Sequence, residues 1–257
     1  VRSGSFHITR PMNHAPMIQT TARMNALVEQ FNRESRDPFH KELSMPSPRR
    51  LHYWLCISAA NADGFDGYSG AAVMVTGAGG SIGLELCRQV VACRPRKLVL
   101  LELSEVALYT AGMELRVLTE GLGIELVPVL GSAGDGVLVE RVLKDHAVDA
   151  VLHAAAYKHV PLVEGNARAG VVNNALATQV LVQKVRAAGV RRFVLVSSDK
   201  AVRPASVMGA TKRMAELIVQ GQAAQPGRTI FSIVRFGNVL GSSGSVIPLF
   251  QEQIALV

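Results

Sequence analysis

Residues 73–90 read VMVTGAGGSIGLELCRQV, and this stretch decides the fold. Its first four residues are apolar or β-branched, which is typical of a buried strand. Glycines then mark a tight turn at Gly77, Gly80 and Gly83. After the turn, apolar residues recur at helical spacing, at Ile82, Leu86 and Val90. A strand, a glycine-rich turn and a helix in this order predict a dinucleotide-binding βα unit.

Each part of this turn has a physical reason. Glycine at the first position permits a positive φ, at the second lets backbone amides approach a pyrophosphate, and at the third lets the helix pack closely on the strand. The helix N-terminus offers unpaired N–H groups and a partial positive charge to the anion. The predicted cofactor contacts are therefore Gly77, Gly80, Ser81, Ile82 and Gly83.

An acidic residue is expected about 20 positions further on, at the end of the second strand. Residues 97–101 read KLVLL, and Glu102 follows them, 19 residues after Gly83. Its carboxylate can accept hydrogen bonds from both ribose hydroxyls and would repel a 2′-phosphate, which favours NAD over NADP. The alternative is a solvated glutamate at a strand end.

Length and composition bound the remaining choices. A chain of 257 residues with 49% hydrophobic residues can bury one large core. Its net charge of +7 comes from scattered lysines and arginines, which favours an acidic ligand or an anionic membrane surface over nucleic acid. Cys56, Cys87 and Cys93 lack metal-ligand spacing and predict buried free thiols. No apolar run reaches the roughly 18 residues of a membrane span, so a cytoplasmic location is expected. His153 and His159 have no cluster of partner ligands, so no metal site is predicted.

The chain divides near residue 70. Residues 1–69 carry several prolines and one convincing helical stretch, Thr20–Glu34, and predict a poorly ordered or atypical extension. Residues 70–257 predict a dinucleotide-binding Rossmann domain with the start of a substrate-binding lobe. The expected strands are 72–76, 97–102, 124–130, 148–153, 190–197 and 229–235. The expected helices are 81–93, 104–120, 136–146, 162–188 with an interruption near Gly170, and 205–223. This alternation predicts an α/β fold, a doubly wound parallel sheet with helices on both faces.

Several strings beyond the glycine turn are more diagnostic: AAAYKHVPLVE at 154–164, SSDKAVRPASVMGATKR at 197–213 and VRFGNVLGSSGSVIPLF at 234–250. With them the chain, from Gly70 to Leu249, resembles the extended short-chain dehydrogenase/reductase superfamily. Within it the chain is similar to the UDP-N-acetylglucosamine 4,6-dehydratases of polysaccharide biosynthesis. The resemblance implies NAD as cofactor, a UDP-sugar as substrate and a chain cut short at its C-terminal end. It leaves membrane association of full-length relatives and a homo-oligomer open.

The resemblance assigns the chemistry to an adjacent acid and amine. In the family the lysine removes the C5 proton of a 4-keto sugar and the aspartate protonates the departing C6 hydroxyl, roles that fall on Lys200 and Asp199. An acid–amine pair at a strand end can divide such tasks, although a random pair of this kind is usually a surface salt bridge. Ser198 is expected to hydrogen-bond the C4 oxygen.

Met208 and Lys212 occupy the tyrosine and lysine positions of the superfamily's Tyr-x-x-x-Lys pattern. A helix places them one turn apart on one face. Methionine cannot ionise, but the resemblance implies the stereochemistry-retaining sub-branch, which has methionine here. Lys212 is expected to bind the nicotinamide ribose, and the base for the C4 hydroxyl stays open between Ser198 acting through water and another group.

The remaining site predictions follow the other strand ends. His153, Ala154 and Ala155 are expected beside the cofactor, although a histidine there is also typical of a hydrogen-bonded core. Lys158 is expected to contact cofactor or substrate, and Asn174 to be structural. The substrate contacts are predicted at Arg235, Asn238, Ser242 and Ser243.

The sequence therefore favours an NAD-dependent nucleotide-sugar 4,6-dehydratase, a hydro-lyase. One alternative is a nucleotide-sugar 4-epimerase, which needs no acid for the C6 hydroxyl. Another is a non-catalytic NAD-binding fragment. The latter is supported by Met208 and by Ser132, which follows Gly131 where relatives usually carry an aspartate for the adenine amino group.

Overall fold

The computed structural model describes residues 8–9 and 67–237. The predicted helix Thr20–Glu34 and most of the predicted extension 1–69 lie outside these residues. So do Cys56 and three of the predicted substrate contacts, Asn238, Ser242 and Ser243.

A seven-stranded sheet forms the centre of the fold, with the strand order β1-β7-β6-β5-β2-β3-β4. Six of its strands run parallel to their neighbours: β2 (Ala72–Thr76), β3 (Lys97–Glu102), β4 (Glu125–Leu130), β5 (Ala150–His153), β6 (Arg192–Ser198) and β7 (Ile230–Phe236). The short β1 (Ile8–Thr9) pairs antiparallel with the outer edge of β7. The order reverses between β2 and β5, so the predicted doubly wound sheet is confirmed and its crevice opens at the carboxyl ends of these two strands.

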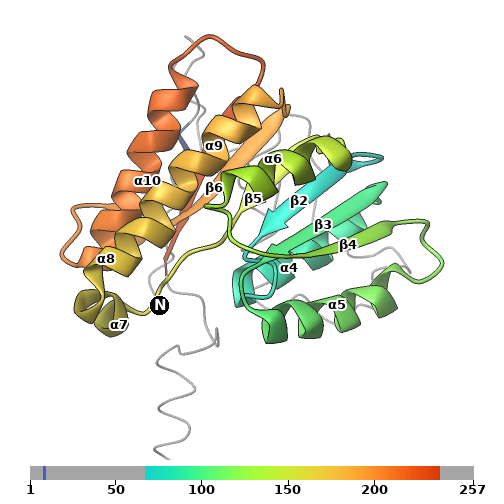
Figure 1. The fold of residues 1–257 in the computed structure, drawn as a ribbon, viewed down its shortest axis with the longest axis horizontal. Coiled ribbons are helices and arrows are strands. Elements are labelled where there is room, and N and C mark those ends of the chain that lie inside the picture. Colours follow the sequence, from blue (N-terminus) through green and yellow to red (C-terminus); the bar gives the residue numbers. More distant parts are fainter. Residues whose placement is uncertain (1–7, 10–66, 238–257) are drawn as a thin grey trace, which may run out of the picture.

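Helices cover both faces of the sheet (Figure 1). On one face α4 (Ser81–Ala92) and α5 (Glu105–Thr119) pack through residues such as Leu86, Val90 and Leu115. On the other face lie α6 (Gly136–Asp145), α9 (Ala177–Ala187) and α10 (Val207–Ala223), which bury Val142, Leu181 and Val219. Burial on both faces explains why the strands are continuous apolar runs rather than alternating ones.

Side-chain caps fix where several helices begin. The Ser104 hydroxyl accepts a hydrogen bond from Ala107 N at the start of α5. Asp135 accepts from Val137 N and Leu138 N at the start of α6, and Ser206 accepts from Gly209 N at the start of α10. These caps satisfy amides that a helix leaves unpaired in its first turn. The helix boundaries therefore fall within two residues of the predicted ones.

The predicted long helix 162–188 is broken in two places. The structure has α7 (Val160–Gly165), α8 (Ala167–Gly170), a π-helical turn η2 (Val171–Leu176) and then α9. The first break lies at Asn166, which has φ −135° and ψ 48°. The interruption predicted near Gly170 is present as the start of the π turn, where a methyl group on Gly170 would lie 2.6 Å from Val163.

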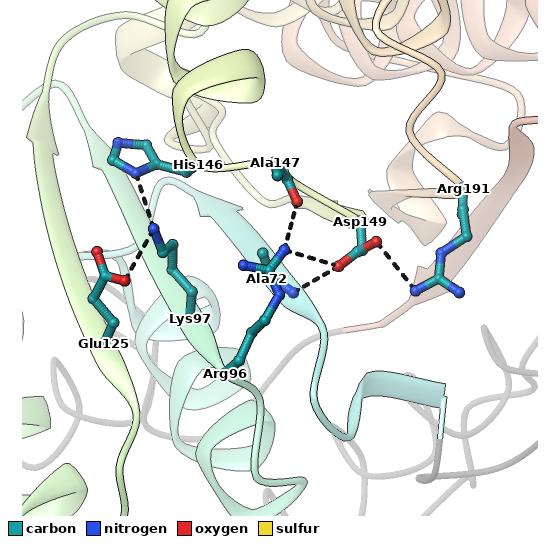
Figure 2. Close-up of polar contacts among 8 residues, drawn as sticks. All are labelled: Ala72, Arg96, Lys97, Glu125, His146, Ala147, Asp149 and Arg191. Atoms are coloured by element: carbon teal, nitrogen blue, oxygen red, sulfur yellow. Dashed lines mark hydrogen bonds and ion pairs between the residues drawn. The ribbon is translucent and has the colours of Figure 1, made fainter.

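The amino ends of the strands are joined by charged side chains, as Figure 2 shows. Asp149, just before β5, accepts hydrogen bonds from Ala72 N at 2.9 Å and from Arg96 at 3.4 Å, and pairs with Arg191 at 3.2 Å. Lys97 bridges to Glu125 at 3.0 Å. These contacts tie together the starts of β2, β3, β4, β5 and β6, and they lie at the edge opposite to the crevice.

The described residues also show the state of two cysteines and the character of the helices. Cys87 and Cys93 are buried free thiols, as predicted, and burial raises the pKa of Cys87. None of the helices in the described part of the chain is long and apolar enough to cross a membrane.

Candidate functional site

The glycine turn is shaped by close backbone contacts. Gly77 has φ +66°, as predicted, and its N–H donates to the Leu101 carbonyl at 2.8 Å. A methyl group on Gly83 would lie 1.9 Å from the Gly77 carbonyl oxygen, so only glycine lets α4 reach the turn. A methyl group on Gly77 would lie 2.7 Å from the backbone of Ala155. The turn is thus fitted against the segment that follows β5, where the crevice opens.

The N-terminus of α4 differs from those of α5, α6 and α10. Its N-cap is Gly80, no side chain within the described residues caps it, and its first turn contains no acidic residue. The positive end of the helix dipole at this start therefore favours an anionic ligand. Such a helix start next to a glycine turn fits the pyrophosphate of a dinucleotide. Ser81 and Ile82 are the first residues of this helix, as predicted.

Glu102 lies at the end of β3 and points at the glycine turn. Its carboxylate accepts hydrogen bonds from Gly79 N at 3.0 Å, from Leu103 N at 2.8 Å and from Ser104 N at 3.0 Å. This ring of amides fixes the carboxylate beside the turn, where a ribose attached to the pyrophosphate would lie. Glu102 is therefore not the freely solvated glutamate of the alternative, and its contact with a ribose stays a prediction.

The side chain of His153 lies in the core, as the alternative interpretation predicted, and its contact with the cofactor stays a prediction. Its ring is 1% exposed and both nitrogens are hydrogen-bonded, Nδ1 to the Thr76 hydroxyl at 2.6 Å and Nε2 to the Thr178 hydroxyl at 2.9 Å. Burial and, secondarily, the charge of Lys212 lower the pKa of His153 to about 3, so the ring is neutral. The neighbouring Ala154 and Ala155 are half-buried at the crevice.

The His153 ring is part of a directed chain of hydrogen bonds. Thr178 donates to the Asn174 carbonyl at 2.7 Å, so its oxygen accepts from Nε2–H of His153. Nδ1 then accepts from the Thr76 hydroxyl, whose oxygen accepts from Ala155 N at 3.4 Å. The chain joins β2, the end of β5 and the π turn.

Asn174 holds the loop that follows β5. Its side chain is buried, accepts from Tyr157 N at 2.8 Å, and donates to the Tyr157 carbonyl and to the Thr211 hydroxyl, both at 3.0 Å. The predicted structural role of Asn174 is confirmed by these contacts. The next residue in the loop, Lys158, is exposed, and its partial burial lowers its pKa.

The predicted acid–amine pair lies at the carboxyl end of β6. Asp199 and Lys200 form a short 3₁₀ turn, η3 (Asp199–Ala201), and the Lys200 ammonium lies 3.2 Å from Asp199 Oδ1. The Ser198 hydroxyl donates to the same oxygen at 2.9 Å and accepts from Lys200 N at 3.2 Å. The side chains of Lys200 and Asp199 are 40% and 54% exposed, so a ligand at this edge can reach both.

Helix α10 supplies the other two predicted residues. Met208 is 3% exposed and Lys212 is 9% exposed, one turn apart. The Lys212 ammonium donates to the Val196 carbonyl at 3.1 Å, and burial lowers its pKa to about 8 although the charge of Glu216 opposes this. A methyl group on Gly209 would lie 2.3 Å from the Lys200 carbonyl oxygen, so η3 rests directly on α10.

Arg235 is tied to a buried carboxylate, and its predicted contact with substrate stays a prediction. Its guanidinium donates to both oxygens of Glu216, at 2.6 and 2.5 Å. Glu216 is fully buried, and it also accepts from Ser197 at 2.6 Å and from Arg213 at 2.9 Å. Burial raises the pKa of Glu216, but the hydrogen bonds from Arg235, Ser197 and Arg213 outweigh it and leave the pKa lowered. Glu216 was not predicted, although its position one helical turn after Lys212 was a signal that could have found it.

Other features lie apart from this edge. A surface hollow of about 470 Å³ is lined by α7, α8 and η2 residues between Gly165 and Val172, and it contains none of the predicted site residues. Within the described residues, no group of three or more His, Cys, Asp or Glu side chains is placed to hold a metal ion.

Together, the sheet order, the glycine turn with Glu102, and the Lys212 helix define an extended short-chain dehydrogenase/reductase with a dinucleotide-binding Rossmann fold. The sequence profile of the polysaccharide biosynthesis protein family matches residues 73–256, and the chain belongs to this family.

Curated relatives extend the comparison. The capsular polysaccharide biosynthesis protein CapD of Staphylococcus aureus is 47% identical over 182 residues, which cover 71% of this chain and 30% of that protein. An inverting UDP-N-acetylglucosamine 4,6-dehydratase of Campylobacter jejuni is 39% identical over 42% of this chain and 33% of its own length. A UDP-glucose 4-epimerase of Rickettsia typhi is 40% identical over 42% of this chain and 33% of its own length. The chain thus spans about a third of the length of these relatives.

Solved structures agree with the fold. The structure of Pen from Bacillus thuringiensis has a TM-score of 0.66 and 31% identity, with 73% of this chain and 58% of that chain covered. The dTDP-glucose 4,6-dehydratase of Streptomyces venezuelae, solved with NAD bound, has a TM-score of 0.50 and 27% identity over 58% of this chain and 51% of that one.

Proposed function

We propose that this chain is the cofactor-binding and catalytic part of an NAD-dependent nucleotide-sugar 4,6-dehydratase that acts on UDP-N-acetylglucosamine or a similar UDP-sugar. The observation that carries the proposal is the pair Asp199 and Lys200, hydrogen-bonded to each other at the carboxyl end of β6 and resting on the helix that holds Lys212. The inverting dehydratase of Campylobacter jejuni among the relatives supports the same reaction class.

The cofactor proposal rests on the crevice between β2 and β5. Gly77, Gly83 and the start of α4 would hold the pyrophosphate of NAD, and Glu102 would hold the adenosine ribose. Lys212 would donate a hydrogen bond to the nicotinamide ribose. NAD bound there would supply the hydride-transfer chemistry that oxidation at C4 and reduction at C6 of the sugar require.

For the elimination step, the acid–amine pair needs only to move one proton from Lys200 to Asp199. Transfer of that proton from the Lys200 ammonium to Asp199 across their 3.2 Å contact converts an ion pair into an amine and a carboxylic acid without changing the net charge. The amine then removes the C5 proton, which the neighbouring C4 ketone has made acidic, while Asp199 gives its proton to the departing C6 hydroxyl. Water leaves, and the ion pair is restored.

Met208 has no proton to exchange, so another group must take the proton of the C4 hydroxyl. We assign Ser198, whose hydroxyl is hydrogen-bonded to Asp199, as the relay that passes this proton through a water molecule to the solvent. With methionine at this position, we propose that the enzyme is a dehydratase of the stereochemistry-retaining type.

The second candidate is a UDP-sugar 4-epimerase. It is favoured by the similarity to the Rickettsia typhi enzyme, and it shares the hydride step at C4. It gives no role to an acid beside Lys200, which is why we place it second.

Mass spectrometry of the full chain incubated with NAD and UDP-N-acetylglucosamine tests these proposals. Dehydration removes one water from the substrate, whereas epimerisation conserves its mass. Lys200→Ala should abolish water loss, and Lys184→Ala, which removes a surface lysine paired with Glu140, should not. NAD binding with no turnover of any kind would instead favour a binding module, and a product of unchanged mass would favour the epimerase.

A further inference from the structure

The carboxylate of Glu216 joins three segments of the candidate site. It lies on α10 one turn after Lys212, accepts from Ser197 at the end of β6, and receives both hydrogen bonds of the Arg235 guanidinium at the end of β7. Ser197 directly precedes Ser198 and the acid–amine pair. We name Glu216, Ser197 and Arg235 the Glu216 junction.

This junction is unusual for its burial. Glu216 is 0% exposed and the Arg235 side chain is 19% exposed, so two opposite charges have been withdrawn from water. A buried ion pair contributes little net stability compared with well-packed apolar side chains, because desolvation offsets the attraction. Its bidentate geometry does, however, fix the relative position of the two groups. Stability alone therefore does not account for it.

We propose that Glu216 is a positioning residue for Lys212, holding α10 against the ends of β6 and β7 so that the ammonium faces the nicotinamide ribose. This inference rests on the proposed binding of NAD. The Lys212 ammonium is itself held by the carbonyl of Val196, the residue next to Ser197, at 3.1 Å. A shift of β6 relative to α10 would therefore move the ammonium as well.

The charges around Lys212 give the proposal a pH signature. Glu216 faces it from α10, the neutral His153 faces it from β5, and Arg235 lies beyond Glu216 on β7, with Arg213 on the more exposed side. The negative charge of Glu216 raises the pKa of Lys212 against the effect of burial. Loss of that charge lowers the pKa, so the ammonium is lost at a lower pH.

The test is the affinity of the full chain for NAD, measured by calorimetry at a series of pH values. In the parent chain the affinity should fall as the pH rises through about 8, where Lys212 loses its proton. Glu216→Gln should weaken binding at pH 7 about tenfold and move the alkaline midpoint about one pH unit lower. The control Arg213→Gln removes one hydrogen bond to the same carboxylate but leaves α10 joined to both strands, and it should change affinity less than about threefold.

A second variant covers the case in which Glu216→Gln does not fold. Glu216→Gln combined with Arg235→Gln removes both charges of the bidentate contact and leaves only the more exposed Arg213 without its carboxylate, so it should fold and still lose affinity. Parent-like affinity and pH midpoint in a folded variant of either kind would overturn the positioning role alone. Absence of NAD binding by the parent chain would instead overturn the proposed function and this inference with it.

Discussion

Gly209→Ala tests whether the contact between α10 and η3 sets the position of Lys200. A methyl group on Gly209 lies 2.3 Å from the Lys200 carbonyl oxygen and 3.2 Å from Pro204 Cβ. Because a Cβ does not approach other atoms within 3.0 Å, the helix and the 3₁₀ turn must separate by about 0.7 Å. The atom that must move is backbone, so side-chain rotation cannot relieve the contact.

The variant should change the free energy of unfolding only slightly and kcat strongly. Overpacking costs about 1–3 kcal/mol, and the better helix propensity of alanine returns about 1 kcal/mol, so the free energy of unfolding falls by about 0–2 kcal/mol and the fold survives. Misplacement of a reacting group by about 1 Å lowers a rate about a hundredfold, so we expect kcat for dehydration to fall about ten- to a hundredfold. NAD affinity should fall less than kcat, because the glycine turn and Glu102 are untouched although Lys212 lies on the same helix.

Gly221→Ala is the matched control. It lies on the same helix, and a methyl group there meets nothing within 4 Å. This variant should raise the free energy of unfolding by up to about 1 kcal/mol and leave kcat unchanged. Thermal unfolding and the rate of water loss, measured side by side, separate the two variants. Equal behaviour of the two alanine variants in both assays would refute the view that α10 positions Lys200.

Three more predictions concern other parts of the fold. Asp149→Ala leaves the Ala72 amide and two guanidinium groups without their acceptor, so urea denaturation should show a loss of about 1–3 kcal/mol. The pKa of His153 falls from its ordinary 6.5 to about 3 on folding, so the unfolded chain binds more protons and stability drops as the pH falls through this window. His153→Gln removes that component, and the unfolding temperature of the variant should depend less steeply on pH between about pH 4 and pH 6. Glu102→Gln should weaken NAD binding about tenfold and narrow the preference over NADP, as competitive titration with the two cofactors would measure. An unchanged preference would contradict the ribose contact.

The strands and the glycine turn could be predicted because their signals are local. Apolar runs bounded by turns locate β2, β3 and β6 to within two residues, and the spacing of Gly77 and Gly83 follows from contacts within one βα unit. Helix starts were predictable for the same reason, since Ser104 caps a helix that begins at the next residue.

The breaks in the long helix and the partners of the buried polar residues could not be predicted in this way. Within the π turn, Asn174 reaches the backbone of Tyr157 and the hydroxyl of Thr211, contacts made across the fold. Arg235 looks like a strand-end ligand in the sequence, yet the carboxylate that takes its guanidinium is on a helix packed over the same strand. The residues adjacent to Arg235 and to Glu216 in the sequence do not indicate that the two side chains pair.

The directed series of hydrogen bonds through His153 restricts which substitutions the protein can accept. Thr76 must give a proton to one ring nitrogen and Thr178 must receive one from the other, so the imidazole is held in a single tautomer and a single orientation. A valine at either threonine would leave a ring nitrogen without a partner inside the core, and an apolar residue at position 153 would leave the Thr76 hydroxyl without its acceptor. Replacement of any one of the three residues therefore leaves a buried polar atom without a partner unless the others are replaced with it, so the trio acts as one unit rather than as three independent positions.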